Sequence, residues 1–325
     1  MIFPWQTGLW GQLQAAQVRQ PHALLIHGPA GVGKLALAEH YAQSLLCEAK
    51  VPRQAPCGEC DGCRWFVAGS HPDFRRVEPE SLARRLEDPE DAEESAPSSG
   101  KRAKPSSEIK VDQVRALDSF LNLKSHRGGR RVALVHPAEA MNPSAANALL
   151  KGLEEPPPGA FFLLVSHRPA RLLATVRSRC VAVPVPAPDP RVSAEWLAQQ
   201  GAKEAGPWLA FSGGAPLLAL QHAQGSGEAL ARMREALRAG DREALAGVND
   251  REQLEALAEV LLKHALDVAF ASCGGKARFG EAKPSTSAAA WLRYARKAGR
   301  NRALARHPLN PRLFAEEMLG EMPKE

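Results

Sequence analysis

A glycine-rich segment near the start of the chain restricts the possible folds more than any other feature. The apolar run Ala23–His27 leads directly into Gly28-Pro29-Ala30-Gly31-Val32-Gly33-Lys34, and apolar residues then recur at helical spacing from 35 to 46. A strand, a glycine-rich loop and a helix in this order are typical of a phosphate-binding loop, in which backbone N–H groups converge on phosphate and a lysine adds positive charge. The sequence therefore predicts an α/β P-loop domain. The candidate nucleotide-binding residues are Gly28, Gly31, Gly33 and Lys34.

Three positions around this loop lack the residues that ATP hydrolysis requires. The residue after the lysine should be Ser or Thr, whose hydroxyl binds magnesium, but it is Leu35. The strand predicted at 131–135 should end in acidic residues that hold the metal and activate water, but His136 and Pro137 follow it. We therefore expect no Mg²⁺ site and no hydrolysis by this chain alone, while binding of ATP or ADP to the loop stays open. The alternative is that an acid from elsewhere replaces the missing ones: Asp112, Glu139 or Glu154.

Four of the six cysteines lie within one short segment: Cys47, Cys57, Cys60 and Cys63. Four thiolates suit tetrahedral zinc, and a site with no ligand position left for water is structural rather than catalytic. An iron–sulfur cluster of the bacterial ferredoxin type would need a cysteine where Val67 stands. Unligated thiols are the third interpretation, which the close spacing disfavours. His71 is a spare candidate ligand or simply the start of a loop.

The remainder of the first half alternates between strands and helices. Short apolar runs predict strands at 131–135, 161–165 and 181–185, and a weaker strand signal lies at 73–77. Helical patterns lie at 111–121 and 142–153. Such alternation predicts a parallel sheet with helices on both faces. The segment 86–108 is rich in Pro and Ser, acidic first and then basic, so we predict a flexible surface insertion there.

Helical patterns alone follow the sheet region. They lie at 191–200, 207–223, 228–239, 251–270, 287–298 and 311–319. The predicted domains are a P-loop domain at 1–185, which includes the cysteine module at 47–63, a small helical domain at 186–225, and an all-α bundle at 226–325.

Composition narrows the function only slightly. The formal net charge of +6 permits contact with phosphate backbones but does not require it. The sequence has no apolar run of about 18 residues, the length that spans a membrane, and no secretory signal, so we expect a cytoplasmic protein without membrane contact. A zinc-dependent DNA-binding module acting alone is a further functional class, but we find no basic helix or aromatic-interleaved stretch that favours it.

Three segments together identify a family. The segments 130–142, 146–157 and 172–180 resemble the bacterial clamp-loader subunits of DNA polymerase III, which are AAA+ proteins, and Ser178-Arg179-Cys180 is a hallmark of them. The resemblance implies an AAA+ domain, a helical lid at 186–225 and a helical collar at 226–325 that joins a circular pentamer. Motor subunits of the family (gamma/tau) keep the hydrolytic residues and carry a sensor arginine where this chain has Pro216. The chain therefore resembles a non-motor subunit; an active motor subunit, which would be a self-sufficient ATPase, is the alternative.

The resemblance also implies roles for particular residues and partners. Arg179 would reach the ATP site of a neighbouring subunit as an arginine finger, where a fixed guanidinium neutralises charge on the transferred phosphoryl group. A surface salt bridge is the alternative for Arg179, and Arg171 and Arg177 lie close to it in sequence. The resemblance implies zinc at the four cysteines. The implied partners are the gamma/tau and delta subunits, the sliding clamp, and primed DNA through the complex, during ATP-dependent clamp loading in replication.

Overall fold

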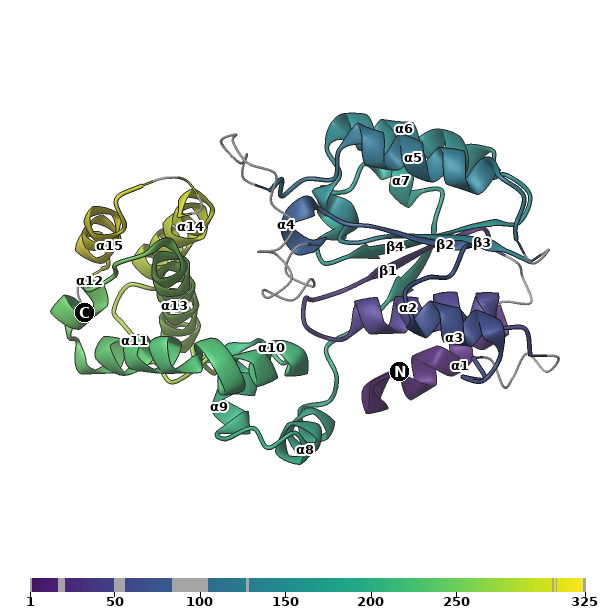
Figure 1. The fold of residues 1–325 in the computed structure, drawn as a ribbon. Helices are drawn as coiled ribbons and strands as arrows, with labels where there is room; N and C mark the ends of the chain where they lie inside the picture. The colour runs from purple at the N-terminus through teal and green to yellow at the C-terminus, as the bar shows by residue number, and fades with distance from the viewer. Residues whose placement is uncertain are drawn as a thin grey trace, which may run out of the picture. The chain divides into compact units, whose positions relative to one another are not determined.

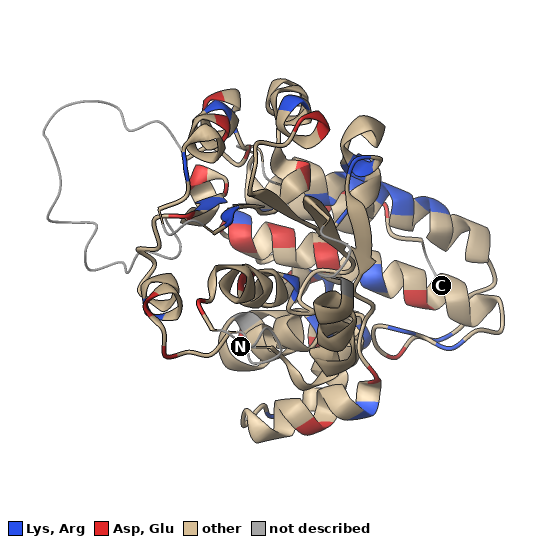
Figure 2. Ribbon diagram, turned by 90° about the vertical axis from the view of Figure 1, so that its right-hand side faces the viewer, with Lys and Arg blue, Asp and Glu red and all other residues tan. Residues whose placement is uncertain are grey.

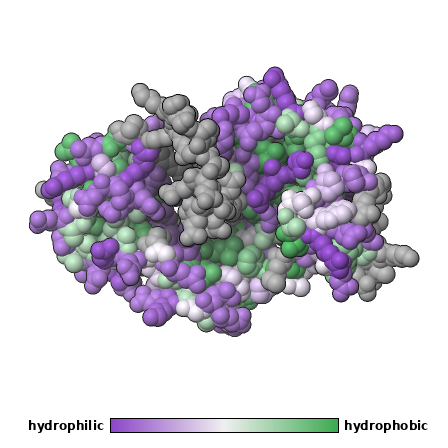
Figure 3. Space-filling view, viewed as in Figure 1, coloured by the Kyte–Doolittle hydropathy of each residue, from purple (hydrophilic) through white to green (hydrophobic). Residues whose placement is uncertain are grey.

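The computed structural model describes residues 2–16, 21–49, 56–83, 105–126, 129–305, 307 and 309–323. The chain divides into two units, Met1–Ala187 and Pro188–Glu325 (Figure 1). Hydrophilic side chains cover most of the face seen in Figure 3. Among the described residues, no helix is long and apolar enough to cross a membrane.

The first unit contains a five-stranded sheet. Its strands are β1 (Ala23–His27), β2 (Phe74–Val77), β3 (Arg131–Val135), β4 (Ala160–Ser166) and β5 (Val181–Pro184). All neighbours are parallel, in the order β2-β3-β4-β1-β5, which confirms the predicted parallel sheet. The central strands β3 and β4 are buried along their whole length, as expected when helices cover both faces.

Helices cover the two faces of this sheet (Figure 1). On one face lie α5 (Val111–Asn122), α6 (Pro143–Glu154) and α7 (Ala174–Arg177). On the other lie α1 (Thr7–Ala16), α2 (Lys34–Leu46) and α3 (Asp61–Val67). The short elements are η1 (Pro4–Gln6), α4 (Glu80–Ala83), η4 (Ala138–Ala140) and η5 (Pro169–Arg171).

Two adjacent residues of β4 anchor the two helical layers. Because side chains alternate across a strand, Phe161 and Phe162 point to opposite faces. The ring of Phe161 lies 5.8 Å from that of Tyr41 on α2. Phe162 belongs to the core cluster formed with α5 and α6, where it packs against Gly152. Both phenylalanines are 1% exposed, so this strand forms the centre of the unit.

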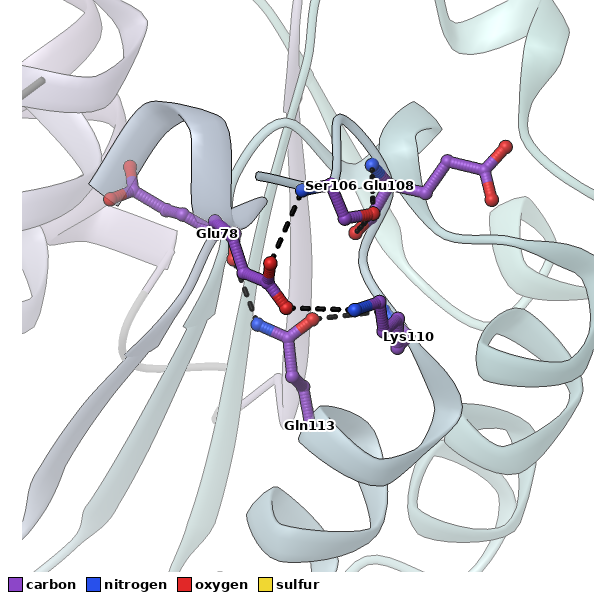
Figure 4. Close-up of polar contacts among 6 residues, drawn as sticks. Glu78, Ser106, Glu108, Lys110 and Gln113 are labelled. Atoms are coloured by element: carbon purple, nitrogen blue, oxygen red, sulfur yellow. Dashed lines mark hydrogen bonds and ion pairs between the residues drawn. The ribbon is translucent and has the colours of Figure 1, made fainter. Parts of the chain in front are cut away.

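Polar contacts join the chain on the two sides of the predicted insertion at 86–108, of which residues 86–104 lie outside the described residues. Ser81 N donates to Ser106 O at 3.0 Å. Glu80 accepts from Ser106 N at 3.2 Å and from Lys110 Nζ at 2.8 Å. Gln113 Nε2 donates to Glu78 O at 2.9 Å (Figure 4). The chain therefore returns to the sheet beside the point where it leaves.

The second unit consists of helices. These are α8 (Pro190–Gln199), α9 (Ala205–Phe211), α10 (Pro216–Gln221), the π-helical turn η6 (His222–Ser226), α11 (Gly227–Ala239), α12 (Arg242–Ala246), α13 (Arg251–Ser272), α14 (Ala288–Leu304) and α15 (Pro311–Gly320). One buried cluster includes Leu197, Trp208 and Phe211, and a second includes Leu257, Trp291 and Met318. The division of this unit at 225 stays a prediction.

The prediction of one continuous helix at 207–223 is wrong. Gly213 and Gly214 have φ values of 64° and 85°, which lie in the left-handed region, and α9 ends before them. Glycine adopts this region without steric cost, so the pair ends one helix and proline at 216 begins the next. Apolar spacing alone does not reveal this break, because the two short helices contribute to one buried cluster.

Candidate functional site

The glycine-rich loop lies between β1 and α2, as predicted. Gly33 precedes the first residue of α2 with φ of 84°, and Gly31 has φ of 75°. A Cβ on Gly28 would lie 2.0 Å from the carbonyl oxygen of Val185. A Cβ on Gly33 would lie 2.4 Å from the ring of Phe3. The glycines are therefore required by close packing of the loop as well as by its turn.

An N-terminal turn that the sequence analysis did not predict holds this loop. Gln6 is 1% exposed, and its Nε2 donates to Val32 O at 3.1 Å and to Gly33 O at 2.9 Å. Trp5 Nε1 also donates to Val32 O, at 3.1 Å. The sequence cue for this turn is Pro4 at its start with Gln6 two residues later. In the structure, Oε1 of Gln6 accepts from Phe3 N at 3.1 Å. Backbone carbonyls of the loop are thereby bound within the chain.

The side chain of Lys34 is buried. It is 2% exposed, and its ammonium donates to the carbonyl of Pro29. Burial lowers the pKa of Lys34 to about 8, and the negative charge of Glu139 opposes the shift. Leu35 follows on α2, half-buried, and offers no ligand atom.

The pKa of Lys34 gives a testable pH dependence of stability. Between pH 8 and 10.5 the unfolded chain holds a proton that the folded chain has released, so this residue makes stability rise with pH. Below pH 8 the folded chain must carry a buried charge. Lys34→Met is therefore expected to stabilise the protein most near pH 7 and to flatten the rise between pH 8 and 10.5. Urea unfolding at pH 7 and 10 measures both effects, and Lys151→Met, at an exposed position, is the control. If the free energies of unfolding of wild type and Lys34→Met changed in parallel with pH, the expectation would be wrong.

The end of β3 holds a histidine–glutamate pair. His136 Nδ1 lies 3.0 Å from Glu78 Oε1, and both side chains are buried. Glu78 also pairs with Arg76 Nε at 3.1 Å. The imidazole thus binds the carboxylate of the residue that follows β2, at the position where an ATPase would present its own carboxylate to magnesium. The peptide bond between His136 and Pro137 is cis.

Of the three acids that could replace the missing ones, Glu139 is the one whose charge acts on Lys34. Its Oε1 accepts from His167 N at 2.9 Å, and its Oε2 is buried without a partner among the described residues. Burial lowers the pKa of His167 to about 4, so this ring is neutral at pH 7. The other two acids pair elsewhere: Asp112 lies 3.6 Å from Arg115, and Glu154 pairs with Arg179.

Arg179 lies just after α7, with its guanidinium held by three groups. Its Nη2 lies 2.5 Å from Glu154 Oε1 at the end of α6. Its Nη1 donates to Thr175 O at 2.9 Å and approaches Ser178 Oγ at 3.5 Å. One third of the side chain remains exposed. The exposed Arg171 and Arg177 form no ion pair with any residue that the structure describes, so Arg179 is the arginine of this segment whose guanidinium is held by neighbouring side chains.

Cys180, next to this arginine, belongs to the core. It is half-buried and packs against the cluster under α5 and α6. Burial raises the pKa of its thiol to about 12. This is the environment of an unreactive packing residue, because the thiolate is the nucleophilic form.

The four clustered cysteines converge. Their Sγ atoms all lie within 4.8 Å of one another, and two of the Sγ–Sγ distances are 4.0 Å. A tetrahedron with metal–sulfur bonds of about 2.3 Å places its sulfurs about 3.8 Å apart. Backbone N–H groups point at three of the sulfurs at 3.4 Å, which stabilises thiolates; the donors are Glu48, Ala49, Cys57, Cys60 and Cys63. The donor set and its geometry fit a four-coordinate metal.

His71 is not brought into this donor set. It is 4% exposed, and its Nδ1 accepts from Asp73 N at 3.1 Å. The ring therefore organises the turn before β2.

Together the sheet order, the loop after β1 and the helices on both faces define a P-loop protein of the AAA+ class. The family described as DNA polymerase III, delta subunit, matches residues 7–189. The chain belongs to the DNA polymerase III delta' family. It is 45% identical to subunit delta' of Pseudomonas aeruginosa over 73% of this chain and 66% of that protein. It is 34% identical to subunit delta' of Escherichia coli over 69% of this chain and 61% of that protein.

The matched region covers less than two thirds of the length of these relatives. In structure, the chain is similar to a DNA polymerase III gamma subunit-related protein of Thermotoga maritima. The two share 16% identity at a TM-score of 0.49, over 96% of this chain and 97% of the other. It is also similar to the RuvB Holliday junction branch migration motor of Thermotoga maritima, with 16% identity and a TM-score of 0.38, over 83% of this chain and 81% of the other.

Proposed function

We propose that this chain is a non-hydrolysing clamp-loader subunit that serves the ATP site of a neighbour. It takes a place in a circular pentamer with gamma/tau and delta subunits through its helical collar at 226–325. It supplies Arg179 to the adjacent subunit and so supports ATP-dependent loading of the sliding clamp onto primed DNA. The observation that carries the proposal is the buried pair of His136 and Glu78 at the end of β3, where a hydrolytic subunit needs a free carboxylate.

The loop of this chain supports the same conclusion. Leu35 cannot bind magnesium, and the ammonium of Lys34 is bonded to the loop's own carbonyl. The remaining N–H groups of the loop favour, at most, binding of ATP or ADP without hydrolysis.

Arg179→Ala tests the function in the reconstituted clamp loader. We expect the isolated chain to show no ATP turnover and the complex carrying Arg179→Ala to turn over ATP more slowly. An arginine finger accelerates its site by about 10³-fold or more, so the served site becomes almost silent while the other sites continue. The matched control is Arg177→Ala, which removes an exposed arginine two residues away. A complex indifferent to Arg179→Ala would leave the chain a passive scaffold.

An active motor subunit is the second candidate, and one observation favours it. Glu139 Oε2 is buried and has no hydrogen-bond partner in the part of the chain that the structure describes, and the charge of this carboxylate raises the pKa of Lys34. If Glu139 replaced the missing acid, the isolated chain would turn over ATP and Glu139→Gln would abolish the turnover. These two results together would show that the chain is a hydrolysing motor subunit and would contradict the non-hydrolysing role proposed above.

We also propose that Cys47, Cys57, Cys60 and Cys63 hold a structural zinc ion. Four soft donors with no place left for water suit zinc without catalysis. The ion would fix the segment between α2 and α3, whose intervening backbone has no regular structure in the part described.

A further inference from the structure

Helix α14 has a distribution of charge that the sequence analysis overlooked. It carries five basic residues and no acidic residue, whereas both signs of charge occur on most other helices (Figure 2). The expectation that the chain has no basic helix is therefore wrong. Uncharged residues separate most of these basic residues along the sequence, so they do not form a continuous basic run.

Packing fixes which side of α14 faces solvent. Trp291, Tyr294, Ala295 and Ala298 are buried against the core that includes α13. Tyr294 OH donates to Met318 O at 2.9 Å, which sets the rotation of the helix. The exposed side then carries, at helical spacing, Arg293, Arg296 and Arg300.

The other two basic residues of α14 each have an acidic partner. Lys297 pairs with Glu321, and Arg302 lies 3.2 Å from Glu259. The three exposed arginines form no ion pair with any of the residues for which the structure gives a position. Their charges therefore face solvent together, on a helix held in place by its opposite side.

We propose that Arg293, Arg296 and Arg300 form a surface that binds the phosphate backbone of duplex DNA. The seven helical steps from Arg293 to Arg300 span about 10 Å, which equals the axial rise of about three nucleotides of one strand. Guanidinium groups match phosphate with paired hydrogen bonds. Both aromatic residues of α14 are buried, so the face offers no side chain on which a base would stack. Binding is therefore independent of sequence.

An acidic protein surface is the competing occupant of a basic face. The centres of protein interfaces are enriched in aromatic residues, but Trp291 and Tyr294 of this helix are turned into the core. The face therefore carries three arginines and the half-exposed Leu292 but no exposed aromatic ring, and this composition favours the phosphate backbone over a protein partner.

The test uses the 325-residue chain and a fluorescein-labelled duplex of random sequence. Fluorescence anisotropy at 50 and 200 mM salt should show weak binding that falls about 40-fold over this range, because three phosphate contacts give a salt slope of about −2.7. The variant Arg293→Gln/Arg296→Gln/Arg300→Gln should lose at least ten-fold in affinity and most of the salt slope. The matched control, Arg115→Gln/Arg191→Gln/Arg232→Gln, removes the same charge from exposed positions on three different helices.

Three outcomes would overturn the proposal. Equal losses in the two triple variants would assign binding to net charge rather than to α14. An unchanged affinity of the α14 variant for the duplex would show that this face of α14 does not bind DNA. Unchanged DNA binding together with weaker assembly of the clamp loader would make an acidic subunit the occupant. None of these results depends on Arg179, since ATP turnover is not measured.

Discussion

Replacing Phe162 with alanine is expected to lower the free energy of unfolding of the first unit by about 3–5 kcal/mol. The side chain is 1% exposed at the centre of β4, so truncation removes buried apolar contacts and leaves a cavity between the sheet and α6. Hydrogen exchange of peptides covering 160–166 measures this free energy in the intact chain. The control is Phe270→Ala, where the ring is 45% exposed and the expected loss is less than about 1 kcal/mol. Similar losses in both variants would contradict the assignment of Phe162 to the core.

A substitution at Gly152 on α6 tests the contact between this helix and Phe162 a second time. A Cβ at this position would lie 2.9 Å from Cζ of Phe162. Gly152→Ala is therefore expected to destabilise the unit, although alanine favours a helix by about 1 kcal/mol over glycine. In the Phe162→Leu background the clash disappears, so the same change should become neutral or stabilising. Additive effects in the double variant would show that the two residues do not compete for this space.

Cys60→Ser is expected to remove zinc from the protein and to unfold the segment that the ion fixes. Wild-type protein should contain about one zinc per chain, and the variant close to none after dialysis, because a structural zinc site needs all four of its ligands. Exchange protection of α3 should fall with the loss of the metal, since metal binding and local folding are one process. Elemental analysis and hydrogen exchange measure the two effects. Cys180→Ser, outside the donor set, should retain the ion.

Two results would remove the zinc proposal. A purified chain without metal would leave four reduced thiols that merely lie close together. A brown protein containing iron and labile sulfide would restore the iron–sulfur alternative, despite the valine at position 67.

Local sequence patterns predicted the elements whose signal is continuous along the chain. The central strands β3 and β4 are short, largely apolar runs, and burial on both faces requires such runs. The convergence of the four cysteines was also predictable, because the whole donor set lies between residues 47 and 63.

Contacts between distant residues could not be predicted from one sequence. Glu78 is 58 residues from His136, and Glu154 is 25 residues from Arg179. The residues next to a glutamate in the sequence do not indicate which distant side chain it pairs with. A glutamate exposed to solvent has the same kind of local sequence as one that forms a buried ion pair. The N-terminal turn was missed for a related reason: its value lies in the bonds from Gln6 to the loop, 26 and 27 residues later.

The position of β1 in the sheet affects how the chain folds during synthesis. This strand is the first of the five to be made, but it pairs with β4 on one side and β5 on the other. One edge therefore stays open until residue 166 has left the ribosome, and the other until residue 184 has. At about 5–20 residues per second, that delay is roughly ten to thirty seconds. An unpaired strand edge is a template for pairing with another chain, so the nascent chain is most exposed to aggregation over this interval. The later helical unit makes mostly local contacts and does not share this delay.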